Sequence, residues 1–162
     1  MIILASAAAG AKAADGLTAR CCVLRQTERF IEKAAMMIRC TASPLEDIIS
    51  SAASDSSLFC LTFLSDIEAA LDSGEINIRA LWHTSLKKAP PEHIRSEELA
   101  VLEELGDILG STDVQGQIDS LSLNKAYIVS LIENAETERK ERGKLYRCLG
   151  ITAGLFIAVI LI

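Results

Sequence analysis

The chain has 162 residues, of which 50% are apolar and only 4% aromatic, and it carries a net charge of −6. Its length allows one compact domain with an added anchor, and its acidic excess excludes nucleic acid from the expected partners. Ala, Leu, Ile, Glu and Ser dominate, which is typical of an all-α protein. The five cysteines are odd in number and irregularly spaced, so we expect reduced thiols rather than a disulfide framework.

The first apolar stretch is shorter than a membrane span. Residues 1–11 carry no charged side chain, and Lys12 and Asp15 follow. A spanning helix needs about 20 apolar residues, and a signal peptide would have a cation before its apolar run. We therefore expect residues 1–16 to be a weak or truncated N-terminal membrane segment.

Apolar residues at helical spacing and local capping signals predict six helices after this segment. The first has an apolar stripe along one face. The second opens with a capping box, in which Ser43 is the N-cap, Pro44 the first helical residue and Glu46 the reciprocal acceptor. The predicted helices are residues 17–41, 44–53, 57–73, 78–89, 97–110 and 114 onward.

Caps and breakers set the other boundaries. Gly74 is a natural left-handed C-cap for the third helix, and Asn77 is placed to cap the fourth. Ser96 and Asp113 are placed in the same way before the fifth and sixth helices. No proline follows, so the sixth helix is expected to continue into the apolar tail, as one helix or with a bend near Gly143. Short connections favour antiparallel neighbours, and the predicted fold class is therefore an all-α six-helix bundle.

The tail of the chain has the pattern of a membrane anchor. Residues 148–162 carry no charged side chain, and five cations precede them closely. Fifteen helical residues reach about 22 Å against ~30 Å of hydrocarbon, a gap that bilayer thinning and snorkelling can close. We expect a C-terminal transmembrane helix over residues 145–162 and a cytoplasmic bundle over residues 17–144, because cations mark the cytoplasmic flank. The alternative is a terminal helix or strand buried in a soluble core. The predicted membrane-flanking residues are Arg142, Lys144, Tyr146 and Arg147.

Small residues recur every four positions in this tail, at Gly150, Gly154 and Ala158. They share one helix face, and small residues at this spacing allow a second helix to approach closely. The sequence therefore predicts helix packing in the membrane at this face. The alternative is that glycine is simply common in membrane helices.

Signals for catalysis are nearly absent. His83 and His93 lie on either side of Pro90 and Pro91, which is not the spacing of a metal site on one helix face. No phosphate-binding glycine loop, zinc motif or nucleophile elbow occurs. We therefore expect no enzymatic activity, no metal and no cofactor. A cluster of acidic residues fits a solvated helix face, with carboxylate metal binding as the alternative: Glu97, Glu98, Glu103, Glu104 and Asp107.

Trp82 and Gly106 are the residues that packing would explain best. Trp82 is the single tryptophan, and we expect it to anchor the core from the fourth helix. Gly106 lies inside the fifth helix, where glycine costs about 1 kcal/mol relative to alanine. Close helix packing is the expected reason, and a notch for partner docking is the alternative.

Two motifs in the last third of the chain resemble those of a known family. Leu109, Gly110, Asp113 and Gln117 match the pattern L-G-x-x-D-x-x-x-Q, and Lys144-Leu145-Tyr146-Arg147-Cys148-Leu149-Gly150 matches the segment leading into a last membrane helix. The chain thereby resembles the stage III sporulation protein AB family over about residues 20–162. The run Leu105-Gly106-Asp107-Ile108 leads into the first motif. The candidates for partner docking in this run and the motif are Gly106, Gly110, Asp113 and Gln117.

The resemblance implies a bundle similar to the cytoplasmic domain of the platform protein, F, of type II secretion systems. It implies a non-enzymatic membrane platform subunit of the channel complex between mother cell and forespore. The implied partners are a secretion-type ATPase, other membrane subunits and membrane lipid, and the implied location is the mother-cell membrane around the forespore. The alternative function is a tail-anchored helical adaptor or regulator unrelated to sporulation. Residues 1–16 depart from the family, whose members usually start with a full apolar membrane helix.

Overall fold

The computed structural model describes residues 2–41, 43–75, 77–109 and 114–160, and within them the side chains of residues 11–146, 148, 149 and 152. These residues form six α-helices and one 3₁₀ turn, with no strand in the described ranges, which confirms the all-α prediction. The elements are α1 (Ile2–Thr41), α2 (Leu45–Ala53), η1 (Ser56–Leu58), α3 (Phe63–Asp72), α4 (Ile78–Lys88), α5 (Ser96–Leu109) and α6 (Val114–Ile160).

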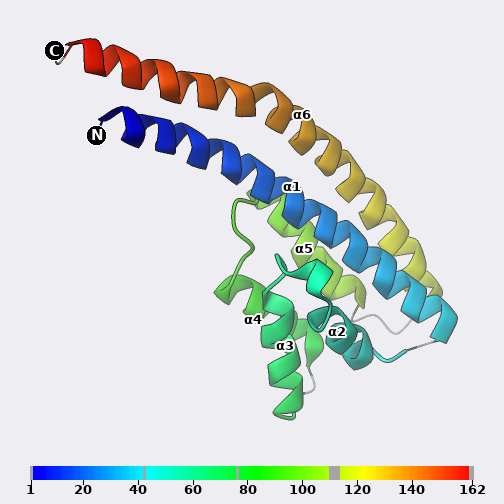
Figure 1. The fold of residues 1–162 in the computed structure, drawn as a ribbon. Coiled ribbons are helices and arrows are strands. Elements are labelled where there is room, and N and C mark those ends of the chain that lie inside the picture. Colours follow the sequence, from blue (N-terminus) through cyan, green and yellow to red (C-terminus); the bar gives the residue numbers. More distant parts are fainter. Residues whose placement is uncertain (1, 42, 76, 110–113, 161–162) are drawn as a thin grey trace.

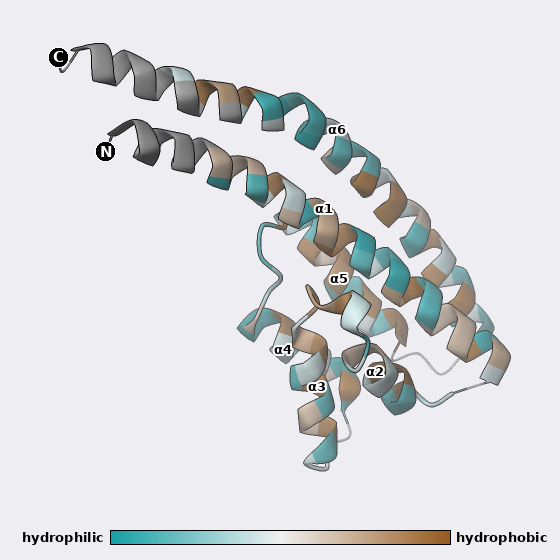
Figure 2. Ribbon diagram, viewed as in Figure 1, coloured by the Kyte–Doolittle hydropathy of each residue, from teal (hydrophilic) through white to brown (hydrophobic). Residues whose placement is uncertain are grey.

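The two long helices, α1 and α6, run antiparallel and pack against each other (Figure 1). The start of α1 and the end of α6 therefore lie at the same end of the molecule (Figure 1). The four shorter helices form a compact group beside the opposite half of this pair. Figure 2 shows hydrophilic residues on α6 between that group and the C-terminal end of the helix.

α6 is one continuous helix of 47 residues, which corresponds to about 70 Å at 1.5 Å per residue. We predicted either one continuous helix or a helix with a bend near Gly143, and the structure has the continuous helix. It curves gently around the shorter helices (Figure 1). α1 begins well before the predicted start at residue 17. Its first part is rich in alanine, the best helix former, so the helix continues where the apolar stripe alone gave no signal.

Trp82 lies at the centre of the core, as predicted, and is fully buried. Its Nε1 donates a hydrogen bond to the backbone oxygen of Leu102 at 2.7 Å. Its ring meets Phe63 edge-on at a centroid distance of 5.1 Å and Phe30 at 5.6 Å. These partners belong to α5, α3 and α1, so one side chain on α4 connects four helices.

Gly106 on α5 provides the space for this indole. A Cβ built on Gly106 would lie 2.4 Å from Trp82 Cδ1, which is inside van der Waals contact. The packing explanation for Gly106 is thus confirmed. The cost of a glycine inside a helix is offset by the burial of the largest side chain in the protein.

The predicted capping box at Ser43 was wrong. The N-cap of α2 is Pro44, without a side-chain cap, and Leu45 is the first helical residue. The Ser43 hydroxyl instead lies 2.6 Å from that of Thr41. A capping box needs an N–H on the capping residue for the acid to bind, and proline has none.

The predicted helix over residues 57–73 was wrong in its first part. The segment contains η1, a turn and then α3, which starts at Phe63. Asp55 caps η1 by accepting from Ser57 N at 2.9 Å, and Gln26 Oε1 accepts from Cys60 N at 2.6 Å. The Gln26 side chain on α1 thus accepts a hydrogen bond from a backbone N–H that, in a continuous helix, would donate to a carbonyl of the preceding turn.

Two of the other predicted caps are confirmed and one is displaced. Gly74 has φ +93 beyond the end of α3, and Asn77 accepts from Ala80 N at 3.1 Å. Ser96 is the first residue of α5 and not its N-cap. Arg95 takes the capping position, because its N–H donates to Glu98 Oε2 at 2.8 Å and its carbonyl accepts from Leu99 N. Asp113 lies outside the described residues.

We predict that Gly106→Ala destabilises the protein by about 1–3 kcal/mol, because the added methyl must displace the Trp82 ring. Gly143→Ala is the matched control, since a Cβ at Gly143 on α6 would meet nothing within 4 Å. The control should stabilise the protein by roughly 0.5–1 kcal/mol through helix propensity. Denaturant unfolding measures both, and equal effects of the two substitutions would contradict the packing account.

Candidate functional site between the two long helices

Arg20 is a buried cation that joins three helices. It lies on α1 with 5% of its surface exposed. Its Nε donates to Glu98 Oε1 on α5 at 2.7 Å, and a second guanidinium nitrogen donates to Glu138 Oε2 on α6 at 2.6 Å. Burial alone would lower the pKa of Arg20, but hydrogen bonds and charge from these two carboxylates raise it above its ordinary value. The guanidinium therefore stays charged inside the protein.

Glu138 is shared by three arginines. Besides Arg20, Arg95 donates to its Oε2 at 2.5 Å and Arg142 to its Oε1 at 2.8 Å. Three cations and the two carboxylates of Glu98 and Glu138 make a cluster with a formal charge of +1. Such a cluster tolerates burial because each carboxylate accepts more than one hydrogen bond.

Further ion pairs cross from α1 to α6 away from this cluster. Arg25 pairs with Glu136, and Lys125 Nζ lies 2.7 Å from Glu32 Oε1. The hydrogen bond from Arg25 lowers the pKa of Glu136 below its ordinary value. Residues that come later in α1 pair with residues that come earlier in α6. All of these ion pairs therefore belong to a single antiparallel register of the two helices.

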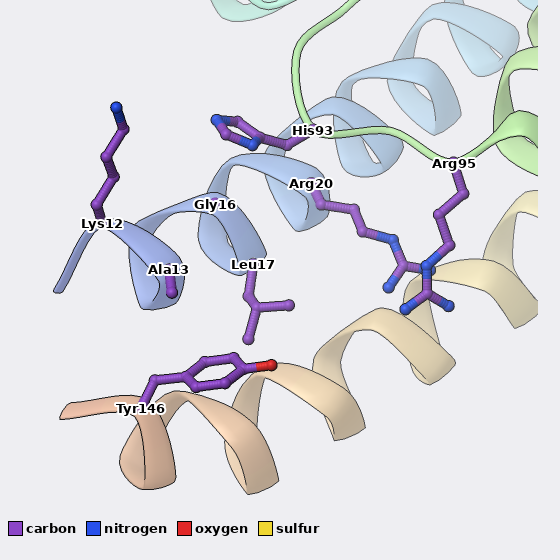
Figure 3. Close-up of a pocket in the computed structure, with 8 residues that line it drawn as sticks. All are labelled: Lys12, Ala13, Gly16, Leu17, Arg20, His93, Arg95 and Tyr146. Atoms are coloured by element: carbon purple, nitrogen blue, oxygen red, sulfur yellow. The ribbon is translucent and has the colours of Figure 1, made fainter. Parts of the chain in front are cut away.

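An open cleft of about 530 Å³ lies beside the cluster, where α1, α6 and the segment before α5 meet. Figure 3 shows Tyr146 and Leu17 between the two long helices, with the Tyr146 hydroxyl directed along the cleft toward Arg20 and Arg95. Lys12 extends away from Tyr146 in this view (Figure 3). Among the described residues that line this cleft, every charged one is a cation, so the cleft favours anionic groups.

His93 forms the wall of the cleft in a strained backbone conformation. Its φ is +64, in the left-handed region that non-glycine residues seldom adopt. Its ring packs on Gly16 of α1, where a Cβ would lie 3.1 Å from His93 Nδ1. Residues held in such conformations cost about 1–3 kcal/mol and cluster at functional sites.

The described residues contain no group of three His, Cys, Asp or Glu side chains that could hold a metal ion. No helix in the described part of the chain is both long enough and apolar enough to cross a membrane.

Comparison with known proteins gives the chain a family. The sequence profile of stage III sporulation protein AB matches residues 1–162. The chain belongs to the stage III sporulation protein AB family. This confirms the resemblance found in the two motifs, and family membership supports a role connected with sporulation.

A solved structure, "Stage III sporulation protein AB (SpoIIIAB)", has the same fold. It is 23% identical and superposes with a TM-score of 0.65, covering 76% of this chain and 98% of its own. At this identity the likeness is one of fold. No curated protein matches the chain.

Two residues of the family motif are placed inside the domain. Gly106 is buried under Trp82. Gln117 is 8% exposed, and its Nε2 donates to the backbone oxygen of Leu109 at 2.9 Å, which satisfies a carbonyl at the end of α5. Gly106 therefore supports the packing of α4 against α5, and Gln117 stabilises the connection between α5 and α6. Gly110 and Asp113 lie outside the described residues.

The predicted membrane-flanking residues do not share one environment. Arg142 belongs to the charge cluster, and Tyr146 lines the cleft. Lys144 is exposed. The side chain of Arg147 lies outside the described ones, and so does the predicted packing face of Gly150, Gly154 and Ala158.

Sequence reasoning missed the charge cluster and placed Glu98 on a solvated face, which was wrong. Glu98 is 1% exposed and pairs with Arg20. One signal was present, because Arg20 lies three residues after Leu17 and four before Leu24, inside the apolar stripe. A cation on a buried stripe needs a buried carboxylate.

We predict that Arg20→Met destabilises the protein by about 3–5 kcal/mol, because it leaves Glu98 buried without its cation. Adding Glu98→Leu should recover much of the loss, since an apolar pair carries no desolvation cost. Lys125→Met, which removes an exposed ion pair on the same interface, should have a much smaller effect. Denaturant unfolding of the three variants measures this, and a double variant as unstable as the single one would contradict the pairing.

Proposed function

We propose that the chain is a non-enzymatic membrane platform subunit of the sporulation channel complex between mother cell and forespore, and that it docks a secretion-type ATPase and other membrane subunits. The observation that carries the proposal is the arrangement of α1 and α6. The start of one and the end of the other leave the bundle side by side (Figure 1). A platform subunit needs this geometry, because the whole folded domain then stays on one side of the membrane.

The charge pattern supports the same orientation. Lys140 and Lys144 are exposed on α6 just before the apolar residues 148–162. Cations at this position favour a cytoplasmic flank and attract anionic lipid. We therefore assign residues 145–162 to a C-terminal transmembrane helix, with residues 1–16 beside it at the same membrane. The cleft lined by Tyr146 then lies at the membrane surface, where tyrosine is enriched.

Gly150, Gly154 and Ala158 form the face that packs against other membrane subunits. Several acidic side chains that could have held a metal are engaged in the domain instead. Glu98 pairs with Arg20, and Glu97 accepts from the hydroxyl of Tyr127 at 2.6 Å. These contacts favour a scaffold over an enzyme, and family membership disfavours an adaptor unrelated to sporulation.

We predict that truncation after Lys144 releases the domain from membranes without abolishing its binding to the secretion-type ATPase. The reason is that the anchor and the folded core lie at separate ends of α6. Vesicle flotation measures membrane attachment, and co-purification with the ATPase measures docking. The Arg20→Met variant in the full chain is a control for effects of lost stability.

Two results would contradict this account. Flotation of the truncated protein would show that residues 145–162 are not the main anchor. Failure of the full chain to bind the ATPase in anionic vesicles would contradict the platform function.

A further inference from the structure

A second open pocket lies between α5 and α6, separate from the cationic cleft. Its volume is about 320 Å³, and Glu104 from α5 lines it together with residues on successive turns of α6. Tyr127, the α6 residue of this pocket nearest the tail, is 18 residues before Leu145, which is about 27 Å along the helix. The pocket thus lies far from the proposed membrane end. Its α6 residues are Ser120, Leu123, Asn124 and Tyr127.

Asn124 is the unusual member of this pocket. It is 5% exposed, and its Oδ1 has no hydrogen-bond partner in the described structure. Buried side-chain acceptors in folded proteins are nearly always paired. Asn124 also lines the pocket, so a rotation of its side-chain amide would present this unpaired acceptor to a donor from outside the chain.

The surroundings of Asn124 determine the charge of that donor. Among the described residues that line the pocket, Glu104 is the only charged one, and it forms no ion pair with another of them. Tyr127 donates its hydroxyl to Glu97, which adds a second carboxylate at the edge. Two carboxylates and an unpaired amide oxygen favour a cation that donates several hydrogen bonds.

The rim of the pocket is apolar. Leu123 is 75% exposed and Tyr127 is 44% exposed. Exposed apolar side chains beside a polar pocket are typical of protein interfaces. A guanidinium fits this combination better than an ammonium, because it is planar, offers five donors and stacks on aromatic rings.

We propose that this pocket binds an arginine side chain of a protein partner, with Glu104 and Asn124 as its acceptors and Leu123 and Tyr127 packing around it. The inference rests on the proposed function in one respect, since it assigns the docking surface for the secretion-type ATPase. It places that surface on the half of the bundle remote from the membrane, where a cytoplasmic partner can reach it.

The first experiment tests the pocket itself in the full chain. The probe is acetyl-arginine amide, with the uncharged isostere acetyl-citrulline amide as its control, and the readout is the NMR signal of the Asn124 side-chain amide. The arginine probe should shift this signal, and Glu104→Gln should weaken its binding about tenfold. Glu103→Gln, on the same helix but outside the pocket, should leave binding unchanged. Equal shifts from the two probes would overturn the proposal.

The second experiment tests the partner. Asn124→Leu removes the unpaired acceptor, so it should leave the unfolding midpoint unchanged or raise it, while it weakens ATPase binding about tenfold or more. Asn134→Leu, at an exposed site on α6, is the matched control. Glu104→Gln should weaken ATPase binding equally and keeps the test valid if Asn124→Leu misfolds.

The outcomes separate the two claims. If the ATPase binds the wild type and the Glu104 and Asn124 variants alike, the docking surface is wrong and the platform function stands. If the ATPase does not bind the wild type, the platform function fails, and so does the assignment of this arginine site to the ATPase.

Discussion

The buried charge of Arg20 is the constraint on which the arrangement of the protein depends. A guanidinium on the inner face of α1 is stable only if carboxylates reach it from neighbouring helices, and here they come from Glu98 on α5 and Glu138 on α6. Because Glu98 also caps the first turn of α5, the same contact fixes where that helix begins. The ionic cluster thus sets the position of α5 and the register of α6 against α1 together.

The register of α1 against α6 determines where the two ends of the chain lie. Two more ion pairs, both on the side of the cluster toward the shorter helices, help to hold α1 and α6 antiparallel over several turns. Both ends of the chain then leave the shorter helices in the same direction (Figure 1). Trp82 and Gly106 hold the other helices together through a contact that only glycine permits. A rigid domain at one end and a paired stalk at the other is the architecture that the proposed platform function uses.

The sequence predicted the parts of this fold that depend on local signals. Gly74 and Asn77 ended and began helices as expected, because a left-handed turn and a side-chain cap are decided by neighbouring residues. The break before Phe63 was missed because Gln26, far away in sequence, binds the backbone at Cys60. Glu98 was misplaced for the same reason, since its partner is 78 residues away.

The candidate sites likewise combine features that neighbouring residues determine with features that depend on contacts between residues distant in sequence. The family motif and a packing role for Gly106 were recognisable from the sequence, yet the indole that Gly106 accommodates and the role of Gln117 required the structure. The pocket at Asn124 gave no sequence signal, because an asparagine on a helix is ordinarily exposed. Its unpaired oxygen is visible only once the neighbouring turns of α5 and α6 are in place.

Cross-linking across the paired helices tests the central claim most directly. In a chain without its native cysteines, Ala13→Cys and Tyr146→Cys would place thiols on two helices that line the same cleft. Oxidation of the full chain in anionic vesicles should join them, whereas Ala13→Cys with Glu133→Cys should stay unlinked. A cross-link confined to the first pair is the result expected for α1 and α6 paired at the membrane surface. Absence of that cross-link, or equal cross-linking of both pairs, would contradict the account.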